Sequence, residues 1–182
     1  MIIVNVMNVG NLETLKGEEH QKKVYELLYT PESIESLDDS IVDHLLTAYG
    51  NKYGIVNLMS DLIIYGKDDV SKKAFSSIPK IEDIGLEASI YARLFEKDGK
   101  RFREKIYKVI EERSDDRLIS KIIIECAYHK GDSEIAKHYT YIEKKDIRLQ
   151  TLRELAGCHL HGRNFDLLRG YAESEYLKEL EK

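Results

Sequence analysis

Two Cys-x-x-His motifs are the residues best suited to chemistry in this chain. Cys126 and His129 form the first motif, and Cys158 and His161 form the second, 32 residues later. If each motif lies on a helix, its cysteine and histidine share one face, because residues i and i+3 are neighbours there. Two adjacent helices would then present two sulfur and two nitrogen ligands, a set that suits tetrahedral zinc. Zinc bound by these four residues is therefore one hypothesis.

Two other interpretations of the same motifs need no metal. The cysteines are small and apolar enough to pack in the core at equivalent positions of a repeat. The histidines would then lie at the C-terminal ends of helices, where positive charge interacts favourably with the helix dipole. A redox role for the two thiols is the remaining alternative. We favour the packing interpretation, because ligands on helices a full hairpin apart are hard to bring within the ~2.0–2.3 Å bonds that zinc needs.

A second candidate site is a run of basic residues near the middle of the chain, with Phe102 and Tyr107 between them. Its cations are Lys97, Lys100, Arg101, Arg103, Lys105 and Lys108. Clustered cations contact phosphates and aromatic rings stack on bases, so nucleic-acid binding by the arginine-containing C-terminal half is an alternative function. A net charge of −5 and a pI near 5.7 favour a solvated helix face instead, and we do not expect a nucleic-acid partner.

The sequence offers little for catalysis. It contains no glycine-rich phosphate loop and no HExxH, GxSxG or CxxC motif. Carboxylate pairs at 38–39, 68–69 and 115–116 fall where helices are expected to begin, and N-capping explains acidic residues there. We therefore expect a protein that is not an enzyme.

Length and composition suit one globular domain. The chain has 182 residues, of which 42% are hydrophobic and 34% charged, and no stretch approaches the ~20 apolar residues of a membrane helix. Two cysteines are too few for a disulfide framework, which favours a reducing cytoplasm. Twenty glutamates and nineteen lysines against two glutamines resemble the composition of thermophile proteins. We expect a single cytoplasmic domain over 1–182 with no membrane partner, and the structure of 1–17 stays open.

The elements that would position these residues follow from a recurring glycine turn. Gly66, Gly99, Gly131 and Gly162 lie 33, 32 and 31 residues apart, each between two segments of helical apolar periodicity. This period is typical of stacked helical hairpins, because one hairpin cannot bury its own apolar face. We predict an all-α superhelix, or solenoid, of about five hairpins and about ten helices over 18–182. The expected helices span 18–29, 38–49, 52–65, 68–78, 81–97, 100–112, 116–130, 133–144, 147–161 and 164–180.

The turns also resemble a known repeat. Ala127-Tyr128, Gly131-Asp132 and Ala136 follow one another in order, and Gly162 with Tyr171 occurs in the next unit. In these residues the chain resembles tetratricopeptide-type αα-hairpin repeats, over about 130 residues and with a slightly shorter period than the family's ~34. The resemblance implies a stack of helical hairpins and a role in binding peptides or proteins.

These observations together predict a non-catalytic protein–protein interaction or scaffold module. Its partner, a protein or peptide, would bind the concave face of the helical stack, which the first helices of the hairpins line. The expected contact residues are Tyr91, Arg93, Lys97, Tyr128, Lys130 and His159. A homodimer is an alternative arrangement, since terminal repeats without polar caps expose apolar faces.

Overall fold

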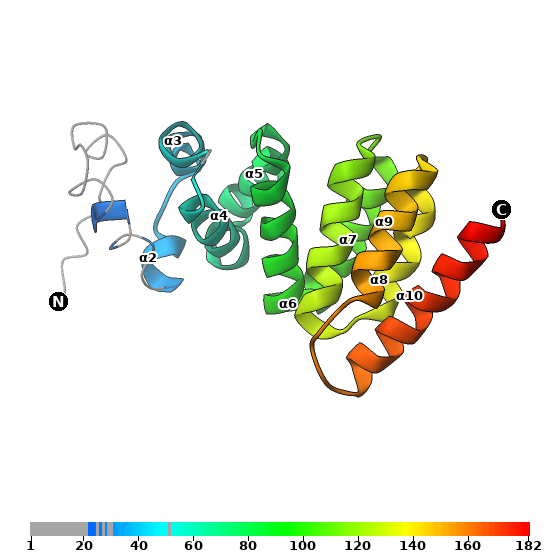
Figure 1. Ribbon diagram of the computed structural model, residues 1–182. Helices are drawn as coiled ribbons and strands as arrows, with labels where there is room; N and C mark the ends of the chain where they lie inside the picture. Colours follow the sequence, from blue (N-terminus) through cyan, green and yellow to red (C-terminus); the bar gives the residue numbers. More distant parts are fainter. Residues whose placement is uncertain (1–21, 25, 27, 29–30, 51) are drawn as a thin grey trace. The chain divides into compact units, whose positions relative to one another are not determined.

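The structure is a computed structural model that describes residues 22–182 except 25, 27, 29–30 and 51 (Figure 1). All regular elements among these described residues are helices, which confirms the predicted all-α class. None of the described helices is both long and apolar enough to cross a membrane. The chain divides into two compact units, Met1–Glu82 and Asp83–Lys182, and each is described by itself.

Two expectations fall at the N-terminus. The segment 1–17 lies outside the described residues. Of the helix expected over 18–29, residues 22–24 and 26 are helical, and the others lie outside the described residues or in a turn.

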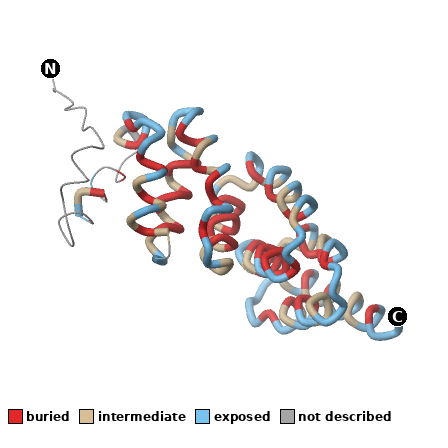
Figure 2. The backbone as a smooth tube through the Cα atoms, turned by 90° about the horizontal axis from the view of Figure 1, so that it is seen from above, coloured by how far each residue is buried: buried red, intermediate tan, exposed pale blue. Residues whose placement is uncertain are grey.

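In the first unit, the helices pack around α4. The elements are α2 (Pro31–Glu35), α3 (Ser40–Tyr49), α4 (Gly54–Tyr65), α5 (Asp68–Ser77) and the 3-10 turn η2 (Ile78–Lys80). Helix α4 contacts α2, α3 and α5, and its apolar face is buried, as Figure 2 shows. The ammonium of Lys73 on α5 lies 3.1 Å from a carboxylate oxygen of Asp39 and 2.8 Å from one of Asp43, which joins α5 to α3. The helix expected over 68–78 is confirmed, and the turn that follows contains Pro79.

In the second unit, α7 is the central helix. The elements are α6 (Ile84–Glu112), α7 (Asp116–Lys130), α8 (Ser133–Ala136), the 3-10 segment η3 (Lys137–Tyr141), α9 (Lys145–Ala156) and α10 (Arg163–Glu181). Helix α7 contacts α6, α8, η3, α9 and α10, and α9 also packs against α10. The apolar residues of α7 that lie between these neighbours, such as Ile119, Ile122 and Ile123, are buried.

Helix α6 corresponds to two expected helices, 81–97 and 100–112. Its backbone leaves the helical region at Asp98 (φ −146°, ψ 64°), so two helical parts meet there. The carboxylate of Asp98 accepts a hydrogen bond of 3.2 Å from the backbone N–H of Arg101, as an N-cap residue does. The two helical parts fold back on each other, because Glu87 near the start of the first lies 2.8 Å from Arg113 just after the second. The turn expected at Gly99 and the two helices expected on either side of it are therefore confirmed.

Two expected helices have different bounds in the structure. The segment expected over 133–144 is the short helix α8 followed by 3-10 turns that end at Tyr141. The helix expected over 147–161 starts earlier, at Lys145, and ends at Ala156. Glycine is a poor helix former, and Gly157 follows the last helical residue.

The loop after Gly157 is held in its non-helical shape by α10. The guanidinium of Arg169 donates hydrogen bonds to the carbonyl oxygens of Cys158 (3.0 Å) and Leu160 (2.6 Å). These carbonyls would otherwise need water or helical partners. The second Cys-x-x-His motif is therefore in a loop and not on a helix, contrary to the expectation.

The turn at Gly131 has the geometry that the glycine pattern predicts. Gly131 follows α7 in the left-handed conformation (φ 60°), which is a common helix C-terminus. A Cβ atom at this position would come within 2.9 Å of the Asn164 Cβ and the Phe165 backbone nitrogen. Glycine is needed here because the first turn of α10 packs directly against the end of α7.

Candidate functional site

The second unit has a groove between α7 and α9, with a volume of about 450 Å³. Helix α7 contributes one wall and α9 with the residue before it contributes the other. The lining residues are Ile84, Arg117, Ser120, Lys121, Ile124, Lys144, Asp146, Ile147, Gln150 and Glu154. The volume is in the range of small-ligand and peptide-side-chain sites, about 300–1,000 Å³.

The floor of the groove is a pair of hydroxyl groups. Ser120 on α7 and Thr151 on α9 lie 2.7 Å apart, and Thr151 is fully buried. The Thr151 hydroxyl donates to the carbonyl oxygen of Ile147 (2.7 Å), so Ser120 is the donor to Thr151. This contact between two small side chains joins α7 directly to α9.

One end of the groove is built around buried Asp116. Its two carboxylate oxygens accept hydrogen bonds of 2.9 Å from the backbone N–H groups of Glu143 and Lys144. Arg148 donates from one nitrogen to the carbonyl oxygens of Ile142 and Glu143, both at 2.7 Å. The segment before α9 is thereby fixed against the first turn of α7. Asp115, the neighbour of Asp116, caps α7 through the N–H groups of residues 117 and 118, as the sequence predicts.

The other end of the groove is fixed by Tyr128. Its hydroxyl donates a hydrogen bond of 2.6 Å to the backbone carbonyl oxygen of Glu154. Partial burial raises the pKa of this phenol above its ordinary value. The last turns of α7 and α9 are therefore linked, and the groove is held at both ends by hydrogen bonds.

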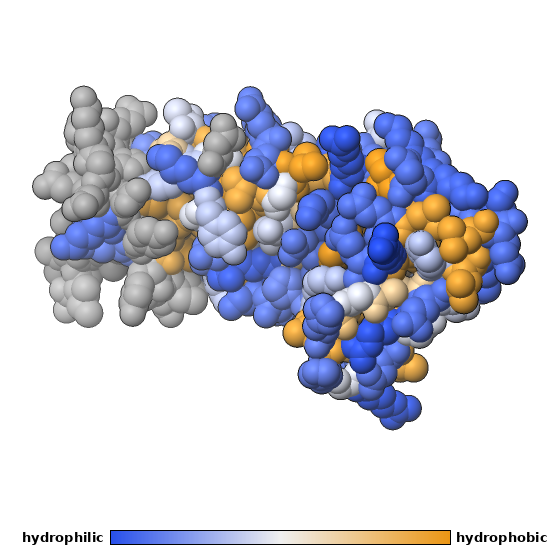
Figure 3. Space-filling view, viewed as in Figure 1, coloured by the Kyte–Doolittle hydropathy of each residue, from blue (hydrophilic) through white to orange (hydrophobic). Residues whose placement is uncertain are grey.

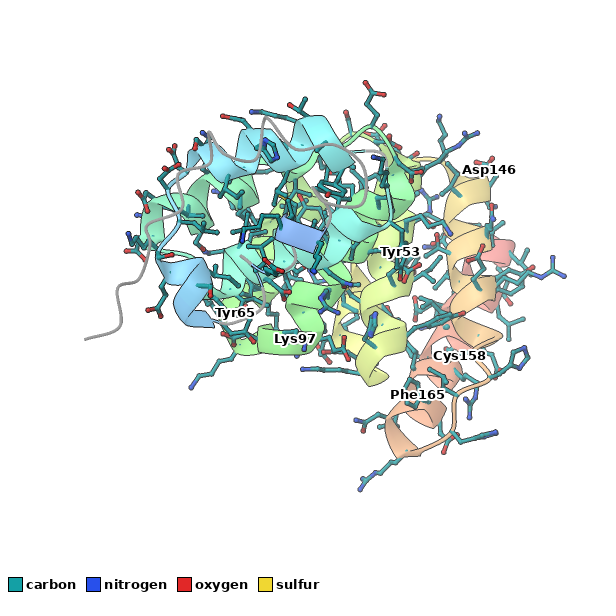
Figure 4. All side chains as sticks on the ribbon, turned by 90° about the vertical axis from the view of Figure 1, so that its left-hand side faces the viewer. Tyr53, Tyr65, Lys97, Asp146, Cys158 and Phe165 are labelled. Carbon is teal, nitrogen blue, oxygen red and sulfur yellow. The ribbon has the colours of Figure 1, made fainter. Side chains whose placement is uncertain are left out.

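The groove carries opposite charges on its two sides. Arg117 and Lys121, one helical turn apart on α7, form what we call the cationic wall, and Lys144 lies on the α9 side at one end of the groove. Asp146 and Glu154, two turns apart on α9 with Gln150 between them, form the acidic wall. Figure 4 labels Asp146 at one end of α9 and Cys158 beyond the other end.

No ion pair joins the two walls in the described part of the chain. The cationic wall has no salt-bridge partner among the described residues, and the only side-chain hydrogen bond there within the acidic wall runs from the Gln150 amide to Glu154 (3.0 Å). Elsewhere in this unit, cations meet acids directly. Examples are Arg103–Asp132 (2.7 Å), Arg113–Glu87 (2.8 Å), Arg148–Glu179 (3.2 Å) and Arg169–Asp166. The groove is therefore a place where opposite charges face a hollow and stay apart.

A second, more open hollow lies between α9 and α10, with a volume of about 650 Å³. It shares Asp146, Gln150 and Glu154 with the first and adds Leu149 and Arg153 on α9 and Tyr176 on α10. Apolar side chains gather beside α9 and the C-terminal part of α10 in Figure 3. The exposed leucines of α10 are Leu167, Leu177 and Leu180.

The expected partner-contact residues lie outside both hollows. Lys97, Lys130 and His159 are exposed, and Arg93 and Tyr128 are partly buried. Tyr91 is 1% exposed, so its side chain serves the interior of the unit and is not available to a partner. Burial raises its pKa well above the ordinary tyrosine value. Its position on the apolar stripe of α6 explains this outcome.

The four residues of the zinc hypothesis do not assemble. Cys126 and Cys158 are buried free thiols, and burial raises the pKa of Cys126. His129 is partly exposed, with its Nδ1 3.5 Å from a carboxylate oxygen of Glu96, and His161 is exposed in the loop after α9. Within the described ranges, no three His, Cys, Asp or Glu side chains are grouped to hold a metal ion.

The basic run on α6 lacks free aromatic rings. Phe102 is fully buried, with Arg101 and Lys105 over its ring at 4.9 and 5.5 Å from the centroid. Tyr107 lies against the His138 ring, with 4.1 Å between centroids. Neither ring is presented for stacking on a base, which is the contact that the nucleic-acid alternative needs.

Sequence reasoning did not find the groove. Its only sequence signal is the i, i+4 spacing of Arg117 with Lys121 and of Asp146, Gln150 and Glu154. Comparison with models of known protein families, with curated proteins and with solved structures found no match to this chain.

Proposed function

We propose that this protein is a non-catalytic interaction module that binds a protein or peptide in the groove between α7 and α9. The observation that carries the proposal is the set of charges that line the groove and have no partner across it. Arg117, Lys121 and Asp146 are exposed and solvated in the free protein, so they are available to a ligand of complementary charge. Partly buried hydrogen bonds at both ends of the groove fix α7 and α9, the helices that carry these charges, and such preorganisation favours binding.

The same geometry argues against a catalytic role for the groove. Its lining contains no histidine or cysteine, and its only carboxylates are Asp146 and Glu154. Eight residues of α-helix separate these two by about 12 Å along the axis. Paired carboxylates that catalyse hydrolysis lie within about 9.5 Å of each other.

We also propose that the helical hairpins stack as a superhelix, similar to tetratricopeptide-type repeats. The packing of α7 against α9, with α8 and η3 between them in the sequence, supports this arrangement, because first helices of successive hairpins are neighbours in such a stack. The groove would then belong to the face that first helices line. Two buried free thiols, Cys126 and Cys158, fit the cytoplasm as a reducing setting.

Peptide display tests this function without a known partner. A random library is selected on the wild-type protein, with prior depletion on a Gln150→Trp variant, whose indole fills the groove from an exposed position. Lys108→Trp, exposed on α6 and outside the groove lining, is the matched control. We expect selected peptides that bind wild type and Lys108→Trp equally and lose affinity for Gln150→Trp. Enriched peptides that bind all three proteins equally would show that the groove is not the binding surface.

A further inference from the structure

The charges of the groove predict what kind of peptide it accepts, and this inference rests on the proposed function. The cationic wall and the acidic wall face the same hollow, yet no ion pair closes it within the described residues. A ligand of one charge sign is attracted by one wall and repelled by the other. A ligand with an acid toward α7 and a base toward α9 is attracted by both.

The shape of the groove fits an extended chain. Asp146 to Glu154 covers about 12 Å along α9, which is the length of about four residues of extended peptide. Gln150, halfway along, has an amide that can both donate to and accept from a peptide backbone. Ile124 and Ile147 add apolar surface to the lining.

An extended chain points successive side chains to opposite sides. An acid and a base that reach opposite walls must therefore be separated by an odd number of positions, such as i, i+1 or i, i+3. The same residues at i, i+2 would face one wall together. We infer that the groove binds an extended peptide segment in which acidic and basic residues alternate, with the acids on Arg117 and Lys121 and the bases on Asp146 and Glu154.

Four labelled octapeptides test this inference by fluorescence anisotropy. One alternates glutamate and lysine, the second has the same composition as four glutamates followed by four lysines, the third is all glutamate and the fourth all lysine. We expect the alternating peptide to bind about tenfold more tightly than its isomer, because several partly exposed charge pairs add up to this ratio. A labelled single-stranded oligonucleotide tests the nucleic-acid alternative in the same assay.

Charge-reversal variants separate the two walls. The single-wall variant carries Arg117→Glu and Lys121→Glu. Both α7 and α9 then present acidic side chains to the groove. This variant should lose affinity for the alternating peptide and gain affinity for the all-lysine peptide. The double-wall variant adds Asp146→Lys and Glu154→Lys. It should recover the alternating peptide, because an extended chain can rotate by half a turn about its axis. Circular dichroism melts check that all variants fold.

Several results would overturn the inference. These are equal affinity for the two isomeric peptides, tighter binding of the all-glutamate peptide, tighter binding of the oligonucleotide, or failure of the double-wall variant to recover binding while it folds normally. If no octapeptide binds but display selects groove-dependent peptides of another pattern, this inference fails and the proposed function stands. If display also gives no groove-dependent peptide, both fail.

Discussion

Helix α7 packs against α6 and against α9, and the charged side chains at these two interfaces are arranged differently. On the side of α6, Arg103 of α6 pairs with Asp132 just after α7 at 2.7 Å, and within α6 itself Arg113 pairs with Glu87 at 2.8 Å. On the side of α9, the two helices are joined at the floor and ends of the groove by uncharged donors or by backbone groups, and the charged side chains above remain apart. The proposed function depends on this contrast: charged side chains are paired beside α6, whereas within the described residues those of the two walls have no partner across the groove.

The largest expected effect comes from breaking the ion pair between Glu87 and Arg113. Glu87 is 4% exposed, and its carboxylate accepts from Arg113 at 2.8 Å. Glu87→Ala leaves the guanidinium without its acceptor and a cavity beside Tyr91, so we expect a loss of about 2 kcal/mol in the free energy of unfolding. Gln150→Ala, in the groove between α7 and α9, should change the free energy of unfolding by less than about 0.5 kcal/mol. Urea unfolding of both variants measures the difference, and equal losses would remove the distinction between the two sides.

Asp116 tests the scaffold of the groove. Asp116→Asn replaces one acceptor oxygen by an NH₂ group that faces a backbone N–H, and we expect a loss of about 1.5 kcal/mol. Asp115→Asn is the matched control, because asparagine caps a helix as well as aspartate does, and its effect should stay within a few tenths of a kcal/mol. Urea unfolding gives both values. A larger loss at Asp115 than at Asp116 would contradict the roles that the hydrogen bonds give these neighbours.

Substitutions of the hydroxyl pair Ser120 and Thr151 should have a smaller effect on the free energy of unfolding, and the double variant distinguishes paired from independent hydroxyls. Thr151→Val keeps the shape but leaves the Ser120 hydroxyl buried without its acceptor, and we expect a loss of about 1 kcal/mol. The double variant with Ser120→Ala removes both partners and should recover part of that loss. Additive losses in the double-mutant cycle would show that the two hydroxyls act independently.

The smallest effect is a pH dependence of stability that arises from Glu87. Burial, opposed in part by the charge of Arg113, raises the pKa of Glu87 above its ordinary 4.5. The folded state then holds this proton to higher pH than the unfolded state, so the contribution of Glu87 to stability is present at low pH and declines as pH rises through the folded pKa. Glu87→Gln, which keeps the shape, should therefore gain stability relative to wild type as the pH rises above 4.5, the ordinary pKa of a glutamate. Thermal melts at several pH values check this, and a constant difference would contradict it.

Local signals in the sequence predicted the helices better than the site. Asp115 as a cap, the stop near Pro79 and the glycine turn at Gly131 each depend on backbone chemistry within a few residues. The shortened helix before Gly157 was missed because its loop is held by Arg169, a contact that comes from the next helix. Sequence separation hides such contacts from periodicity.

The groove was missed for a related reason. Residues such as Lys121 and Gln150 are polar positions on amphipathic helices, and the sequence gives them the same pattern whether they face solvent or a hollow. Conversely, Tyr91 was expected at a surface although it belongs to an apolar stripe, and the stripe decides its position. Cys126 and Cys158 are both buried, as the packing interpretation of their motifs predicts, although only Cys126 lies on a helix.

The hydrogen bonds from Arg169 to the loop between α9 and α10 affect how that loop responds to proteases and to inserted labels. A protease must draw a segment into its active site in extended form, with the carbonyl groups free. Here two carbonyl groups of the loop are occupied by one guanidinium, although His159 and Leu160 are exposed. We therefore expect this exposed loop to resist proteolytic cleavage. A label or tag inserted there would break the hydrogen bonds that connect the loop to α10.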